Sequence, residues 1–137
     1  MDSELTSGIE DTTIKNVDLT NNLLEGVYVG HGAQVDGLTI EDSDLSDNLN
    51  GVGISGTGTN VDNVLIKNSK MNSNNNHGII VQSNAEVGSI TIQDSELNSN
   101  TLQGIMIQTN ANLNFLYIYN SDINNNLGSG LAVNNAQ

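Results

Sequence analysis

Isoleucine recurs along the chain at a fixed spacing, and mostly polar residues surround it. Five segments of eleven residues begin 26 residues apart, at Thr12, Leu38, Val64, Ile90 and Leu116. Their third position is always isoleucine, at Ile14, Ile40, Ile66, Ile92 and Ile118. Around it, apolar and polar residues alternate with the period of two that is typical of a strand with one buried face. The pattern predicts a repeated strand whose isoleucines stack inward.

Three further apolar groups share this spacing. The eighth position of each segment is large and apolar, at Leu19, Leu45, Met71, Leu97 and Ile123. A second apolar run follows a glycine in every repeat, over 26–29, 51–54, 78–81, 104–107 and 130–133. A last column contains Val35, Val61, Val87 and Leu113. The second glycine comes one residue early, and residues 55–59 restore the spacing, which indicates a surface loop that tolerates length changes.

These columns predict an all-β fold, a single-stranded parallel β-helix of about five 26-residue coils with three short strands per coil. Crossovers between parallel strands are right-handed in nearly all proteins, so we expect a right-handed helix. Nothing marks a boundary inside the chain, and we expect one domain over residues 1–137. We expect Ile40 and Ile66 to touch in neighbouring coils, about 4.8 Å apart.

Polar columns repeat with the same spacing. The eleventh position is always asparagine, at Asn22, Asn48, Asn74, Asn100 and Asn126. An amide both donates and accepts, so we expect a structural ladder of stacked asparagines between the coils. The fifth position alternates Asn16, Asp42, Asn68, Asp94 and Asn120, which keeps each carboxylate beside an amide.

Composition excludes several functions. The chain has three lysines, no arginine and sixteen acidic residues, a net charge of −13. Too few cations remain to neutralise a phosphate backbone, so we expect no nucleic-acid partner. No apolar run approaches the length of a membrane span, and we expect no membrane partner. With no cysteine, there is neither a disulfide framework nor a thiolate site.

The repeats and their asparagine column resemble the right-handed parallel β-helix family of pectate-lyase-like proteins. The segments 74–81 and 90–95 are most similar to coils of secreted polysaccharide lyases, polygalacturonases, mannuronan epimerases and bacterial or phage surface proteins. The resemblance covers residues 9–136. It implies an extracellular or cell-surface location, although residues 1–11 have no signal-peptide pattern.

The enzymatic motifs of these relatives are incomplete here. Pectate lyases use an arginine base, and this chain has no arginine. Gly30-His31-Gly32 matches a polygalacturonase tripeptide, but the accompanying acidic motifs are missing. The alginate epimerase motif contains proline, which this chain lacks. His77 precedes a glycine, and we interpret it as a solvated turn residue. We therefore expect a non-enzymatic structural or adhesive module.

Two binding sites remain as hypotheses. Glu41, Asp42, Asp44 and Asp47 supply hard oxygen ligands that could hold Ca²⁺, although a solvated acidic face explains them more simply. Apart from this ion we expect no cofactor. Tyr117 and Tyr119 beside Gln93 could stack on sugar rings, as a carbohydrate-binding remnant of a lyase-like or epimerase-like protein, although packing of the pair against a further coil or a partner explains them more simply.

Both ends of the chain fall within a coil, and no capping element is visible. We expect an excised piece of a longer surface protein, or an engineered repeat scaffold with no natural ligand. An apolar cross-section around Leu5, Ile9, Leu131 and Val133 predicts self-association through open coil ends.

Overall fold

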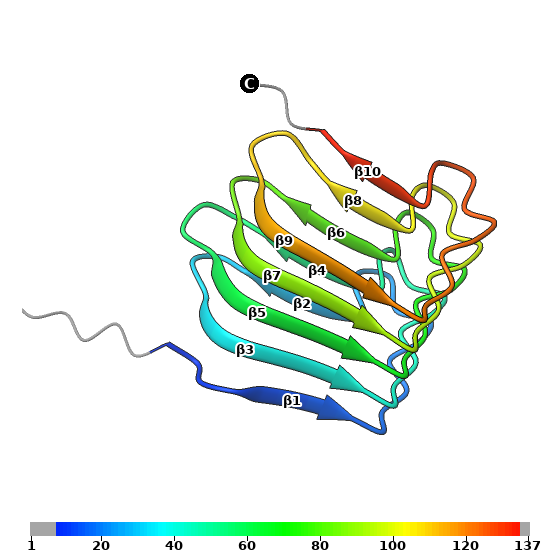
Figure 1. Ribbon diagram of the computed structural model, residues 1–137, viewed down its shortest axis with the longest axis horizontal. Helices are drawn as coiled ribbons and strands as arrows, with labels where there is room; N and C mark the ends of the chain where they lie inside the picture. The colour runs from blue at the N-terminus through cyan, green and yellow to red at the C-terminus, as the bar shows by residue number, and fades with distance from the viewer. Residues whose placement is uncertain (1–7, 135–137) are drawn as a thin grey trace, which may run out of the picture.

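The computed structural model describes residues 8–134 as a stack of parallel β-coils (Figure 1). Two five-stranded parallel sheets form it, in the orders β1-β3-β5-β7-β9 and β10-β8-β6-β4-β2. Among the described residues there is no helix that could cross a membrane. The strands are β1 (Thr12–Lys15), β2 (Val27–Gly30), β3 (Gln34–Glu41), β4 (Val52–Ser55), β5 (Asn60–Lys67), β6 (Ile79–Gln82), β7 (Glu86–Gln93), β8 (Ile105–Ile107), β9 (Asn112–Tyr119) and β10 (Leu131–Val133).

The first sheet confirms the predicted register. Ile40 of β3 pairs with Ile14 of β1 and with Ile66 of β5. Ile92 and Ile118 continue the same line in β7 and β9. Ile40, Ile66 and Ile92 are fully buried, because each is covered by its equivalent above and below. This stack of isoleucines forms the centre of the core.

The second sheet carries the change in loop length. Val52 pairs with Val27, and also with Ile79. The first partner is 25 residues away and the second is 27, so the missing residue before Gly51 is recovered before β5 begins. A Cβ on Gly78 would lie 2.6 Å from the carbonyl oxygen of Gly104, which explains the glycine that begins each of these strands. The coils approach too closely there for a side chain.

The coils have strands on two sides, and not on the three that the sequence predicted. The Val35 and Ile40 columns lie in one eight-residue strand, β3, in which Asp36 is left out of the pairing register with β5. The remaining side has only single-residue bridges, such as Asp18 to Asp44. It stays short because Asn16 and Asn21 have positive φ angles of 55° and 59°, so the chain turns at both.

These turns also explain the fifth column better than charge alternation does. All five of its residues have φ between 44° and 55°. Asparagine and aspartate adopt this left-handed conformation more readily than other residues with a Cβ. The alternation of charge is real, but the backbone conformation is what restricts this column to these two residue types.

The asparagine ladder is present and has a direction. Asn48 N–H donates to Asn74 Oδ1, and Asn74 N–H donates to Asn100 Oδ1, each at 2.9 Å. Asn74 Nδ2 also donates to Asn100 Oδ1 at 3.0 Å. Asn48, Asn74 and Asn100 are fully buried, whereas Asn22 at the end is exposed. Each amide therefore satisfies backbone N–H groups that the turning chain cannot pair with carbonyl groups.

The sixth column forms a second ladder, whose role the sequence pattern did not reveal. Ser43 N–H donates to Ser69 Oγ, and Ser69 N–H donates to Ser95 Oγ, both at 3.1 Å. Each hydroxyl in turn donates within its own coil, as Ser69 Oγ does to the carbonyl oxygen of Lys67 at 2.8 Å. The serines thus hold the corner that follows the long strands.

Replacing the central ladder residue should destabilise the fold. Asn74→Ala removes the acceptor of Asn48 N–H and leaves buried groups unpaired, at a cost of about 1–3 kcal/mol in the free energy of unfolding. Urea denaturation measures this, with Asn22→Ala as the control. Replacing the exposed Asn22 should lower the free energy of unfolding by less. Equal effects of the two variants would show that the ladder does not hold the coils together.

Candidate functional site

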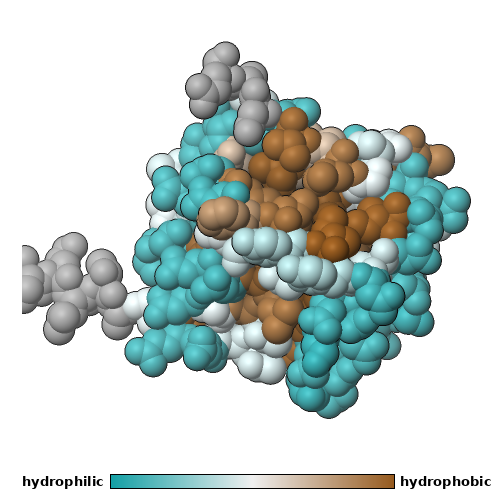
Figure 2. All heavy atoms as spheres, in the orientation of Figure 1, coloured by the Kyte–Doolittle hydropathy of each residue, from teal (hydrophilic) through white to brown (hydrophobic). Residues whose placement is uncertain are grey.

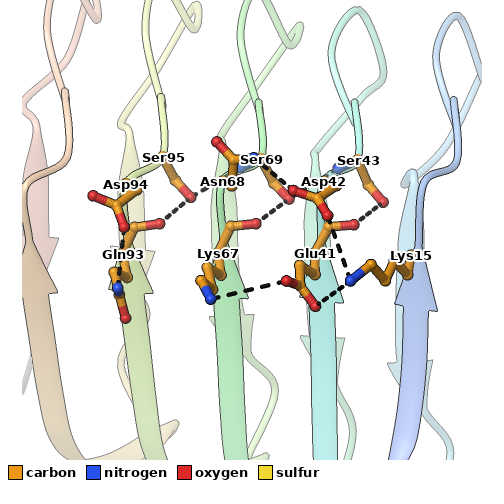
Figure 3. Close-up of polar contacts among 10 residues, drawn as sticks. All are labelled: Lys15, Glu41, Asp42, Ser43, Lys67, Asn68, Ser69, Gln93, Asp94 and Ser95. Carbon is orange, nitrogen blue, oxygen red and sulfur yellow. Dashed lines mark hydrogen bonds and ion pairs between the residues drawn. The ribbon is translucent and has the colours of Figure 1, made fainter.

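Polar side chains gather at the corner that follows the long strands (Figure 3). On the outside of the sheet, Lys15 Nζ lies 3.1 Å from Glu41 Oε2 and 3.6 Å from Asp42 Oδ2. Lys67 Nζ lies 3.9 Å from the other oxygen of Glu41. The hydrogen bond and charge of Glu41 raise the pKa of Lys15. These exposed pairs fix the register more than they add stability.

At the turn itself, amides bind carboxylates in the neighbouring coil. Asn68 Nδ2 donates to Asp42 Oδ1 at 2.5 Å, and Asn120 Nδ2 donates to Asp94 Oδ1 at 2.6 Å. The hydrogen bonds from Asn120 and Gln93 hold the pKa of Asp94 below its usual value. The ionised form of Asp94 is therefore stabilised, and both carboxylates act as acceptors between coils.

Two shallow grooves lie along this corner. One of about 580 Å³ includes Asp18, Asp42 and Asp44 in its lining, together with Lys70. The other, of about 440 Å³, includes Asp94, Glu96 and Asp122. The grooves are therefore mainly acidic, with Lys70 in the lining of the first and with Lys15 and Lys67 beside Glu41 at the same corner. They favour cations over the phosphate or uronate groups of polyanions.

The structure does not bring the four predicted calcium ligands together. Glu41 and Asp42 contact Lys15. Asp44 Oδ1 accepts a hydrogen bond from Ser46 N–H at 3.1 Å, and Asp47 is exposed in a turn with φ of 58°. Within residues 8–134, no group of three or more histidine or acidic side chains is placed to hold a metal ion.

The predicted aromatic pair is part of a larger strip. Phe115, Tyr117 and Tyr119 project from the outer face of β9, with ring centroids 6.2 and 6.4 Å apart and ring planes within 10° of parallel. They are 59%, 43% and 54% exposed. In the adjacent strand, Gln93 pairs with Tyr119. The sequence reasoning missed Phe115, although its position two residues before Tyr117 was a usable signal.

The uncharged residues around the strip set it apart from the rest of the surface. Ser89, Thr91 and Gln93 of β7 lie beside the three rings in register. None of the six side chains carries a charge at neutral pH, in a chain whose net charge is −13. Apolar side chains gather around β9 and β10 at this end of the stack (Figure 2). The strip can offer ring faces, hydroxyl groups and an amide to a ligand.

His77 is buried, which corrects its interpretation as a solvated turn residue. It is 5% exposed, and its Nδ1 accepts a hydrogen bond from Gln103 N–H at 3.3 Å. The backbone N–H of His77 donates to Asn50 Oδ1 at 3.1 Å, and Asn50 Nδ2 donates to Glu25 Oε1 at 3.0 Å. These residues precede the glycine of each coil and form a further ladder. Burial lowers the pKa of His77.

His31 of the Gly30-His31-Gly32 segment lies in an exposed turn with φ of 55°. Its ring contacts the ring of Tyr28 edge-on, with centroids 5.9 Å apart. No hydrogen bond or ion pair joins its side chain to an acidic residue in the part of the chain that the structure describes. The tripeptide therefore makes a turn beside an aromatic ring.

The comparisons with known proteins agree with the architecture. The family model described as "Right handed beta helix region" matches residues 5–137. No curated protein and no solved structure matches the chain. The family match covers nearly the whole chain, so the chain belongs to the family of right-handed β-helix proteins.

His77 should make stability depend on pH. Its folded-state pKa lies below 6.5, so around and below that pH the unfolded chain binds a proton that the folded chain excludes. The free energy of unfolding should therefore fall as pH falls through about 6.5. Urea denaturation between about pH 5.5 and 7.5 measures the free energy of unfolding at each pH. Its change with pH should be smaller for His77→Gln than for the unchanged protein. The prediction would be contradicted if the pH dependence were unchanged in His77→Gln, or if it were reduced equally in the control variant His31→Gln.

Proposed function

We propose that this member of the right-handed β-helix family is a non-enzymatic structural or adhesive module of an extracellular or cell-surface protein. The observation that carries the proposal is the use of its polar side chains. The side chains of Ser43, Asp42 and Asn74 each bond to a neighbouring coil, and Ser43 Oγ also donates to the carbonyl oxygen of Glu41. Side chains engaged in this way hold the stack together and are not free to act on a substrate.

The positions of the perturbed titratable groups support the same proposal. Lys15 belongs to the first coil, Asp94 to the fourth, and the buried His77 to a different corner of the stack. A base that activates a nucleophile, or an acid and a base that act on one bond, must lie within hydrogen-bonding reach of each other or of the reacting atom. The arrangement suits a rigid spacer, and the resemblance to secreted and surface proteins supports the location.

Carbohydrate binding is the second candidate, and the aromatic strip on β9 favours it. The apolar faces of pyranose rings stack on aromatic rings, and their hydroxyl groups bond to amides such as Gln93. Three parallel exposed rings along one strand offer an extended platform for this contact. Because the chain is strongly acidic, the ligand best suited to the strip is a neutral glycan.

Absence of catalysis is directly testable. Incubation with polygalacturonate, alginate and a neutral glucan should release neither reducing ends nor unsaturated products, because the chain lacks the arginine base and the proline-containing motif of the enzymes it resembles. The proposal would be overturned by an activity that co-purifies with the folded protein and is abolished in the His31→Ala variant. Circular dichroism of that variant establishes that the fold is retained.

A glycan array separates the two candidates. If the strip binds neutral glycans, Tyr117→Ala and Tyr119→Ala should each weaken binding by roughly tenfold, since stacking on one ring contributes about 1–2 kcal/mol. Tyr28→Ala is the control, because Tyr28 is 46% exposed on the other sheet. No bound glycan, or equal losses in all three variants, would rule out the strip as a sugar site.

A further inference from the structure

Asn50 is the one asparagine of the chain that a glycine follows, and both residues of the pair lie inside the stack. Asn50 is 3% exposed, and Gly51 is buried beside it. Glycine has no Cβ to hinder its own backbone nitrogen, and an open chain bends freely there. In an unfolded chain the Gly51 nitrogen can therefore reach Cγ of the Asn50 side chain, which makes this pair the most reactive asparagine site of the sequence.

The reaction converts the side-chain amide of Asn50 into a carboxyl group. The Gly51 nitrogen gives its proton to solvent and forms a bond to Cγ of Asn50, while Nδ2 takes up a proton and leaves as ammonia. The product is a cyclic imide. Water then adds to one of its two carbonyl carbons and opens the ring, which leaves either aspartate or an isomer whose main chain runs through the former side chain. The net change consumes water and releases ammonia.

The folded stack holds the atoms that this reaction must move. Gly51 N–H donates to the carbonyl oxygen of His77 at 3.1 Å, an acceptor that cannot carry the proton away. Asn50 Oδ1 accepts from the backbone N–H of His77 at 3.1 Å, and Nδ2 donates to Glu25 Oε1 at 3.0 Å. Glu25 lies in the preceding coil and His77 in the following one. The amide is therefore held from both sides against the rotation that would present Cγ to the Gly51 nitrogen.

Close packing around Gly51 opposes the same movement. A Cβ at this position would lie 2.6 Å from the carbonyl oxygen of Gly78 and 2.6 Å from Cγ of Met71. The next coil and the core thus lie directly against the Gly51 backbone. They leave little room for an imide ring or for the water that opens it.

We propose that Asn50 and Gly51 form a deamidation site that folding keeps closed and unfolding opens, and that reaction there prevents the chain from rebuilding the stack. Aspartate at position 50 has no donor for Glu25 and places a second carboxylate against it in an almost fully buried site. The isomer also lengthens the main chain, which disturbs the register of the coil. Each opening of the second and third coils therefore exposes the chain to an irreversible loss.

Peptide mapping by mass spectrometry tests the first half of the proposal, on the full chain incubated in mildly alkaline buffer with and without urea. In urea, Asn50 should convert faster than any other asparagine. In native buffer its conversion should be slower by roughly tenfold or more, because the reaction must await opening of the coils.

Thr57→Asn supplies the matched control. It creates a second pair of asparagine and glycine in an exposed loop, where Gly58 N–H donates no hydrogen bond to the described residues. Position 57 should convert in native buffer as well as in urea. Conversion of Asn50 in native buffer as fast as at position 57, or no preference for Asn50 in urea, would overturn the proposal.

Asn50→Asp reproduces one product and tests the second half. It should lower the urea midpoint of unfolding, because two carboxyl groups then face each other where an amide met a carboxylate. Adding Glu25→Gln restores a donor opposite position 50 and should recover part of the midpoint, whereas Glu25→Gln alone should change it less than Asn50→Asp does. A midpoint for Asn50→Asp equal to that of the unchanged protein would show that the product refolds, against the proposal.

Discussion

The fold depends on one kind of contact, in which an N–H group at a corner of a coil donates to a side-chain oxygen in the neighbouring coil. Along the straight sides, neighbouring coils are joined by ordinary parallel pairing, as between Ile40 and Ile66. At corners such as Asn68 the chain turns through a left-handed residue and that pairing stops. Serine and asparagine oxygens then replace the carbonyl acceptors, and in the described part of the chain no buried side-chain nitrogen or oxygen lacks a hydrogen-bond partner.

This constraint also shapes what the protein can do. A residue that must repeat in every coil to maintain a ladder cannot be adapted freely to chemistry, and the serine and asparagine columns are of this kind. The surface open to variation is the outer face of the long strands. There the row that holds Thr39, Leu65 and Thr91 ends in Tyr117. In such a stack the flat outer faces are therefore better suited to carry a site than the ladder columns are.

The ladders run in both directions along the stack. Asn74 N–H donates to Asn100 Oδ1 in the following coil, whereas Asn98 N–H donates to Asn72 Oδ1 in the preceding coil. In the first coil Val17 takes the place of serine in the sixth column, and its N–H still donates to Ser43 Oγ at 3.3 Å. The corner contacts therefore join each coil to the coils on both sides of it.

The sequence by itself determined the coil length, the inward isoleucine, leucine and methionine columns, the asparagine ladder and the loop compensation before Gly51, because all of these follow from equivalent residues repeating every 26 positions. Only the tertiary structure decided that the third side is reduced to single-residue bridges, that His77 is buried, and that Glu41 and Asp44 diverge. A repeat shows which residues lie above one another, but it does not show where the backbone turns between them. The direction of each side chain depends on those turns, and so the site could not be assembled from the pattern alone.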